Sequence, residues 1–349
     1  MFQQLEPAMS KPVSHPPTVP VSAWSCTRRG AFRLLAAAAA LLAFPGAPAL
    51  AEKPLRIVVP FSAGSTIDSL ARLVAATLPE VSDYKAVFVE NRSGAAGIIG
   101  TNTVVRAQPD GYTLLLQANG LTTTPAVRDD LPFDTLKDLA PVILVGTTPY
   151  AFIAPASLPA TSLTELFDQA RKSGQKISFG TSGLGSQSQF VLVQLAKQAK
   201  VEFLEVPFRG QAEIMLGVMG DQVQLGMMNL PSALQQMQDK RIKLLATITK
   251  ARTPMTPAVP TLAESGLGDL EESAWYGFLA PANTPPAVIA ALNKGIAATL
   301  RRPEAQAKLA EMGLDVAASS PEAFAAKLRQ ETARYRAIAD EQNLRARQQ

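Results

Sequence analysis

The segment Arg56–Asp68 reads Arg-Ile-Val-Val-Pro-Phe-Ser-Ala-Gly-Ser-Thr-Ile-Asp, and it fixes the expected fold more than any other stretch of the chain. A β-branched run is followed by a turn of small residues, and an apolar helical pattern begins near Thr66. The first N–H groups of a helix have no partner inside it, and the helix dipole adds partial positive charge there. Gly64 leaves the backbone open to a ligand, so the turn is suited to a carboxylate or phosphate, although Ser65 with Asp68 could instead form an ordinary capping box.

A second segment, Ile177–Gln189, repeats this order of strand, small-residue loop and helix with the sequence Ile-Ser-Phe-Gly-Thr-Ser-Gly-Leu-Gly-Ser-Gln-Ser-Gln. Two such loops in two parts of one chain predict a cleft in which helix N-termini face one anion from both sides. A third strand-to-helix junction, Val206–Gln211, contains Arg209, which could supply a bidentate cation or lie solvated on the surface.

Short β-branched runs alternate with helical patterns along the chain, which predicts an α/β fold with largely parallel strands. A chain of this length suits two domains of ordinary size. Serine or threonine residues at three predicted helix starts, Ser162, Thr284 and Ser320, are expected to cap them. The expected strands are Leu55–Val59, Ala86–Glu90, Tyr112–Gln117, Val142–Val145, Tyr150–Ala154, Lys176–Phe179, Val201–Val206, Val223–Met228, Ile242–Thr247 and Trp275–Ala280.

The first 51 residues are typical of an export signal. Arg28, Arg29 and Arg33 precede the apolar run Leu34–Phe44, and Ala49-Leu50-Ala51 offers the small-x-small pattern of a cleavage site. A run of about 11 residues is too short for a bilayer core that needs roughly 20. We therefore expect a periplasmic product cleaved after about Ala51, by either the general or the twin-arginine route.

This signal contains the single histidine, His15, and the single cysteine, Cys26. The exported product would have neither, which excludes a Ser-His-Asp triad, a cysteine nucleophile, a cysteine–histidine zinc site and a disulfide framework. The first 51 residues also hold four of the 33 Lys and Arg and one of the 29 Asp and Glu, which leaves a net charge of +1 and no indication of nucleic-acid binding. We expect no metal and no cofactor. Ser82–Lys85 has the S-x-x-K spacing, but the S-D-N and K-T-G motifs of such enzymes are absent, so the chain is not expected to be an enzyme.

Several motifs, in order, resemble those of the substrate-binding proteins of tripartite tricarboxylate transporters, the Bug family. The resemblance extends over essentially all of the chain beyond residue 51. The motifs are Ile57–Gly64 with Asp68, Val89–Gly97, Pro109–Leu114, Phe133–Pro141, Phe179–Ser186, Val206–Gly210, Pro260–Gly266 and Trp275–Gly277 with Ala280–Pro285.

The resemblance implies a periplasmic-binding-protein fold, type II-like, with two hinge-connected domains and a ligand cleft between them. It implies domain 1 at residues 52–150 plus 277–349 and domain 2 at residues 151–276. It also implies a small carboxylate ligand (a di- or tricarboxylate, an aromatic acid or an amino acid), membrane transporter subunits as partners and a monomeric state. A sensor role, presenting the ligand to a receptor kinase, is the alternative.

Fifteen ligand-binding positions are expected, most of them carried over from the family onto the two loops. They are Phe61, Ser62, Ala63, Gly64, Ser65, Thr66 and Asp68 on one side, Thr181, Ser182, Gly183, Ser186 and Gln189 on the other, and Asn119, Arg209 and Asn229 beside them. Three residues depart from the family pattern: Ser65 replaces a usual glycine, Gln189 a common histidine, and Gln224 a common acidic residue. Trp275 is expected either to pack in the core or to report domain closure.

Overall fold

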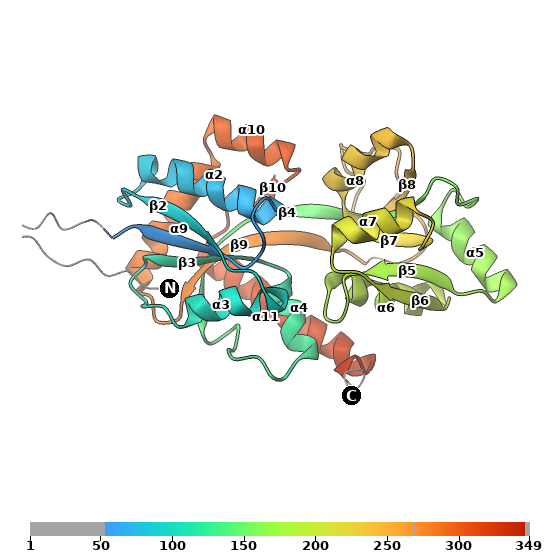
Figure 1. Ribbon diagram of the computed structural model, residues 1–349, viewed down its shortest axis with the longest axis horizontal. Helices are drawn as coiled ribbons and strands as arrows, with labels where there is room; N and C mark the ends of the chain where they lie inside the picture. Colours follow the sequence, from blue (N-terminus) through green and yellow to red (C-terminus); the bar gives the residue numbers. More distant parts are fainter. Residues whose placement is uncertain (1–52, 269, 346–349) are drawn as a thin grey trace, which may run out of the picture. The chain divides into compact units, whose positions relative to one another are not determined.

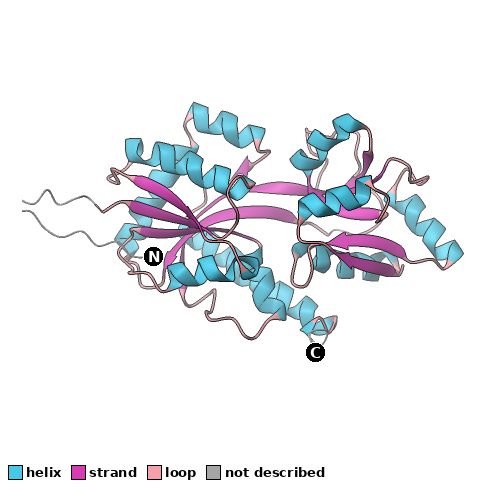
Figure 2. Ribbon diagram, viewed as in Figure 1, coloured by secondary structure: helices cyan, strands magenta, loops and turns pink. Residues whose placement is uncertain are grey.

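The computed structural model describes residues 53–268 and 270–345 (Figure 1). These residues belong to one compact unit, Glu52–Gln349. The predicted signal peptide, with its export route and cleavage site, lies outside the described residues. Strands and helices alternate along the described chain, which confirms the predicted α/β class (Figure 2). The expectation of largely parallel strands is wrong, because β4 (Leu139–Pro155) and β9 (Ser273–Pro281) pair antiparallel with all their neighbours.

The described strands pair in the order β2-β1-β3-β9-β4-β7-β5-β6, and β8 and β10 each pair with β4. Strands β1, β2, β3, β9 and β10 with the first part of β4 form sheet A, and β5 to β8 with the last part of β4 form sheet B. The bounds are β1 Leu55–Val59, β2 Val87–Asn91, β3 Thr113–Ala118, β4 Leu139–Pro155, β5 Ile177–Thr181, β6 Phe203–Pro207, β7 Leu225–Asn229, β8 Ile242–Thr247, β9 Ser273–Pro281 and β10 Asp315–Val316.

Strand β4 corrects the sequence prediction, because the two strands expected at Val142–Val145 and Tyr150–Ala154 are one. Its first part, Leu139–Pro149, pairs with β9, and its last part, Tyr150–Pro155, pairs with β7 and β8. The residues between the two expected strands stay extended because β9 pairs along all of them. The two-residue strand β10 is too short to have been predicted.

The strand directions place the C-terminal edges of the two sheets opposite each other. Strands β3 and β4 both run antiparallel to β9, so β1, β2 and β3 point along β4 toward sheet B. Strand β7 runs antiparallel to β4 and parallel to β5, which is parallel to β6, so these three point back toward sheet A. The loops after β1 and β5 therefore lie on facing edges, the place where open α/β sheets bind their ligands.

Helices cover the sheets on both faces (Figures 1 and 2). Helices α2, α9 and α10 lie on one face of sheet A, and α3, α4 and α11 lie on the other. Strand β1 is consequently an almost continuous buried apolar run. The helices are α2 Thr66–Val81, α3 Ile98–Val105, α4 Gly120–Val127, α5 Leu163–Ser173, α6 Gln187–Ala199, α7 Gln211–Met219, α8 Leu230–Gln236, α9 Pro286–Leu300, α10 Pro303–Glu311 and α11 Pro321–Glu341, with short 3-10 turns at Ala95–Gly97 and Met237–Asp239.

Two of the three predicted helix caps are confirmed. The hydroxyl of Ser162 accepts from the Glu165 N–H at 3.1 Å, and that of Ser320 accepts from the Ala323 N–H at 3.2 Å. The prediction at Thr284 is wrong, because its hydroxyl donates to the Pro281 carbonyl and α9 begins two residues later. A proline within the first turn suffices there, since it offers no N–H that needs a partner.

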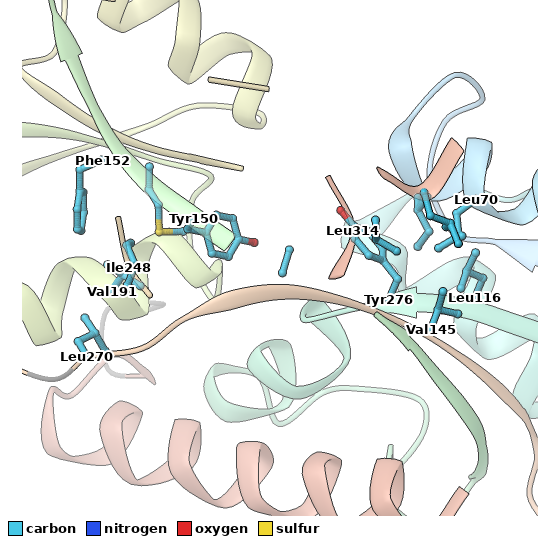
Figure 3. Packing of buried hydrophobic residues seen from close by; sticks show 14 of the residues in the cluster. Leu70, Leu116, Val145, Tyr150, Phe152, Val191, Ile248, Leu270, Tyr276 and Leu314 are labelled. Atoms are coloured by element: carbon cyan, nitrogen blue, oxygen red, sulfur yellow. The ribbon is translucent and has the colours of Figure 1, made fainter. Parts of the chain in front are cut away.

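The buried apolar side chains follow β4 and β9 from one sheet into the other. Figure 3 shows Leu116 and Val145 toward one end of this core and Phe152 toward the other, with Tyr150 and Tyr276 nearer the middle. Within residues 53–268 and 270–345, no helix has both the length and the hydrophobicity required to span a bilayer.

Candidate ligand-binding site

Loop 1, residues 60–65, connects β1 to α2 and is shaped by its own hydrogen bonds. The Ser65 hydroxyl donates to the Ser62 carbonyl at 2.9 Å and accepts from the Asp68 N–H at 3.4 Å, so Ser65 is the N-cap of α2. Gly64 has φ +82°, and a Cβ placed on it would meet nothing within 4 Å. The loop is therefore held by its capping residue while its glycine faces open space.

Asp68 fixes loop 1 from the first turn of α2, and it is only 2% exposed. One carboxylate oxygen accepts from the Gly64 N–H at 2.9 Å and from Arg72 at 3.0 Å, and the other accepts from Asn91 at 2.8 Å. Burial alone would raise the pKa of Asp68, but hydrogen bonds from Arg72, the Gly64 N–H and Asn91 outweigh it and hold the pKa below its ordinary value. With both oxygens engaged by the protein, Asp68 braces the loop.

We expect Asp68→Asn to lower the free energy of unfolding at pH 7 by about 2 kcal/mol, because an amide cannot accept all three hydrogen bonds. A carboxyl group whose pKa is lowered by folding stabilises the protein fully above its ordinary pKa, and this contribution is lost as the pH falls from there through the lower pKa of the folded state. The variant should therefore lose less stability than wild type in urea unfolding between about pH 5 and pH 3. The exposed Asp83→Asn serves as control; equal acid sensitivity of wild type and Asp68→Asn would contradict this role.

Loop 2, residues 182–186, connects β5 to α6 and repeats the design. The Ser186 hydroxyl caps α6 by accepting from the Gln189 N–H at 3.3 Å. Gln189 accepts from the Gly185 N–H at 2.9 Å and donates to Glu205 on the neighbouring strand β6 at 3.1 Å. Gln189 thus corresponds to Asp68, since each is the third residue of its helix. Each accepts from the N–H of the residue before the helix cap, and each also hydrogen-bonds to a side chain on the neighbouring strand.

The remaining polar groups of loop 2 divide into those used by the protein and those left free. The Thr181 hydroxyl donates to Glu205 at 2.8 Å and accepts from the Gly183 N–H at 3.2 Å. In contrast, the hydroxyls of Ser62 and Thr66 in or beside loop 1, and of Ser182 in loop 2, make no hydrogen bond to any residue that the structure describes. These three hydroxyls are the free donors on the facing edges.

Helix α4 brings the two loops close together. A Cβ on Gly185 would lie 2.6 Å from a methyl group of Val127 and 3.8 Å from the Cα of Thr124, both on α4. Thr124 in turn lines a small cavity together with Gly97, and a Cβ on Gly97 would lie 3.7 Å from the ring of Phe61. Loop 2 thus packs on α4, the 94–97 turn packs on loop 1, and α4 and this turn line one small cavity.

Four glycines follow strand C-termini on this edge, and each leaves room for a ligand. A Cβ built on Gly64, Gly120, Gly183 or Gly210 would meet no atom within 4 Å. They come after β1, β3, β5 and β6, respectively. The backbone near them includes the N–H groups of Ala63 and Thr66 in the first part and of Leu184 and Gln187 in the second, none of which donates to an acceptor within the described chain.

Three other predicted positions have partners within the protein. Asn119 clamps β9, because its amide donates to the Ser273 carbonyl at 3.1 Å and accepts from the Trp275 N–H at 2.9 Å. Asn229 accepts from Gln211 at 3.4 Å. Arg209 is 93% exposed and pairs with Glu213 at 3.4 Å, so in this structure its guanidinium is a solvated surface group.

The departures from the family pattern have structural explanations. Ser65 caps a helix, and Gln189 braces loop 2. Gln224 accepts from the Ser178 N–H at 3.1 Å near the N-terminal ends of β5 and β7, away from the C-terminal edge that carries loops 1 and 2. Trp275 is fully buried, with its indole N–H donating to Glu331 at 2.8 Å, which is the arrangement of a packed core residue.

Sequence reasoning missed the groups that hold the loops from outside. Asn91 also donates to the Phe61 carbonyl at 3.2 Å, and Glu205 accepts from both Thr181 and Gln189. The turn Gly94–Gly97 has positive φ at all four residues, including Ala95 at +47° and Ala96 at +52°. The motif Val89–Gly97 contained Asn91 and this turn, but β6 gave no comparable signal for Glu205.

The arrangement is chemically suited to hold an anion. It offers free hydroxyl and N–H donors and helix N-termini from two sheets. No group of three or more His, Cys, Asp or Glu side chains that could hold a metal ion occurs among the described residues.

Comparisons with known proteins show which family the chain resembles. The model of the tripartite tricarboxylate transporter family receptor matches residues 70–344. Protein BugT of Bordetella pertussis is 31% identical over 300 residues, covering 83% of this chain and 91% of BugT. The R. palustris protein Rpa4515 with adipate is 32% identical with a TM-score of 0.74, covering 82% of this chain and 96% of that one. MatC from Rhodopseudomonas palustris with bound malate is 27% identical with a TM-score of 0.71, covering 82% and 98%.

Proposed function

The chain belongs to the tripartite tricarboxylate transporter receptor family, and from this premise we propose that it is a periplasmic receptor that captures a small carboxylate between loops 1 and 2. One observation carries the proposal: two capped loops on facing sheet edges keep hydroxyl and N–H donors free, including those of Thr66 and Ser182. Related structures that contain malate and adipate support the same ligand class.

Binding on this scheme is capture without chemistry. The domains extend over residues 52–150 plus 277–349 and over residues 151–276, and β4 changes partner at Tyr150, next to the first of these boundaries. An anion that bridges the loops stabilises the closed arrangement in proportion to its preference for that arrangement. The protein is then a monomer that is exported, cleaved after about Ala51, and delivers its ligand to the membrane subunits of the transporter.

A thermal-shift screen tests this function. The purified protein is heated with mono-, di- and tricarboxylates, aromatic acids and amino acids, starting with malate and adipate. A ligand at 100 times its Kd contributes about 2.7 kcal/mol to stability, so the cognate class should raise Tm by several degrees. The uncharged amides of the best acids are the controls. If no carboxylate raises Tm more than its amide does, the proposed function is wrong.

A further inference from the structure

A buried polar cluster joins the first turn of α6 to β4, to the start of β9 and to α11. We define it as the Glu272 cluster: Glu272, Gln187, Tyr335, Arg334 and Tyr150. Glu272 precedes β9 and is 3% exposed; Gln187 is the first residue of α6 and is 8% exposed. Tyr335 lies on α11 and is fully buried. The Glu272 carboxylate therefore joins the start of β9 to α6 and α11, and Gln187 extends the cluster to Tyr150 of β4.

Every hydrogen-bonding group of the Gln187 side chain has a partner in this cluster. Its Nε2 donates to a Glu272 oxygen and to the Tyr335 hydroxyl at 3.1 Å, and its Oε1 accepts from the Tyr150 hydroxyl on β4 at 3.3 Å. Gln187 directly follows Ser186, the cap of α6, and its own N–H is among the free donors of the site. Because Gln187 adjoins the last residue of loop 2, the hydrogen bonds that fix its side chain also fix the backbone N–H groups at that end of the loop.

Glu272 is the acceptor on which the cluster depends. It accepts from Gln187, from the Tyr335 hydroxyl at 2.9 Å and from the Arg334 guanidinium. Burial raises the pKa of Glu272, while Arg334, Gln187 and Tyr335 oppose that rise. The ring of Tyr335 also packs on Phe190 of α6 with centroids 4.8 Å apart, so α11 contacts α6 through apolar surface as well.

We propose that Glu272 is a positioning residue that holds the first turn of α6, and with it loop 2, in register with β9 and α11 for ligand binding. The inference rests on the proposed function, since it assigns a role to loop 2 as a ligand-binding element. A receptor that closes on its ligand binds more tightly when its hydrogen-bond donors are already fixed. A mobile donor would lose conformational entropy when the ligand orders it, and this loss would weaken the affinity.

Glu331, on α11, provides a matched control. Like Glu272 it is a largely buried carboxylate, and it accepts from Trp275 at 2.8 Å, Thr122 at 3.1 Å and Lys327 at 2.7 Å. Its partners belong to β9, α4 and α11 itself, and none belongs to α6. Glu331→Gln therefore also replaces a largely buried, hydrogen-bonded carboxylate with an amide, but it removes no hydrogen-bond partner of the first turn of α6.

The first test needs no ligand. Hydrogen–deuterium exchange at residues 182–189 should speed up about tenfold in Glu272→Gln, because the loop loses a charge-assisted hydrogen bond, and should stay at the wild-type rate in Glu331→Gln. Exchange in loop 1 should not change in either variant. Unchanged exchange at residues 182–189 in Glu272→Gln, or an equal rise in both variants, overturns the proposal whether or not a carboxylate binds.

The second test exchanges the two side chains and uses the carboxylate that raises the wild-type Tm most in the thermal-shift screen. Gln187→Glu alone places two carboxylates in one buried site, and Glu272→Gln alone replaces the carboxylate with an uncharged amide that has a single acceptor oxygen; each should weaken the affinity measured by calorimetry about tenfold. The double variant restores one carboxylate–amide pair and should return to within about threefold of wild type. Losses that simply add in the double variant would show a general packing defect and overturn the proposal. Absence of any wild-type binding would refute the proposed function and leave the exchange result to decide this inference.

Discussion

The double variant Thr66→Ala with Ser182→Ala should bind its carboxylate about 100-fold more weakly than wild type and remain folded. A hydrogen bond to a charged group contributes roughly 1.5 to 3 kcal/mol, and each 1.4 kcal/mol is a tenfold change in Kd. Both hydroxyls lack protein partners among the described residues, so their removal leaves no buried group unsatisfied. Calorimetry with the best carboxylate from the thermal-shift screen measures the change.

The two single variants make this prediction sharper. If one anion bridges the loops, Thr66→Ala and Ser182→Ala should each weaken binding about tenfold, because each loop supplies a donor. If the ligand bound to one loop alone, one of the two single variants would keep the wild-type affinity. Thr164→Ala with Ser173→Ala is the matched control: both residues lie on α5, their hydroxyls donate to carbonyls at 3.0 and 3.4 Å, and that of Ser173 also accepts from the Gln175 N–H at 3.3 Å. Full affinity in the double loop variant would refute the assignment of these loops.

The fold could be predicted largely from local sequence. Apolar runs buried on both faces, such as Leu55–Val59, and small-residue turns before helices carry their signal within a few residues. The continuity of β4 could not be predicted in this way. Gly146 to Pro149 have no strand signal of their own and are extended because β9, more than 120 residues later, pairs with them. Pairing between distant segments overrides local propensity.

The candidate site was predictable as a pair of loops but not as a division of labour within them. The polar side chains in and just after the two loops look alike in sequence. Those of Ser65, Asp68 and Gln189 form hydrogen bonds within the protein, whereas those of Ser62, Thr66 and Ser182 form none with any residue that the structure describes. Which side chain forms an internal hydrogen bond depends on neighbours from other strands, such as Asn91 and Glu205, which only the tertiary structure brings close. The residues around Glu272 were missed for the same reason, since they come from four separate elements.

Gly277 in β9 should prove intolerant of substitution: Gly277→Ala is expected to lower the free energy of unfolding by about 3 kcal/mol. A Cβ there would lie 2.3 Å from the ring of Phe324 on α11. That ring cannot move away cheaply, because it is fully buried and packs edge-to-face on Trp275 with centroids 5.4 Å apart. Urea unfolding of wild type and variant at pH 7 measures the loss.

Two further variants separate this clash from a general sensitivity to side chains at glycine positions. Gly120→Ala adds a Cβ in the first turn of α4 where no atom lies within 4 Å, so its stability should equal or exceed that of wild type by up to about 1 kcal/mol. Combining Gly277→Ala with Phe324→Leu should lower the free energy of unfolding by less than the sum of the two single changes, because the smaller leucine side chain leaves room for the added methyl group. Strict additivity would mean that α11 does not press on β9 as described. Since α11 also carries Arg334 to Glu272 and Tyr335 to Gln187 of α6, such a result would weaken the proposal that Glu272 and α11 position loop 2.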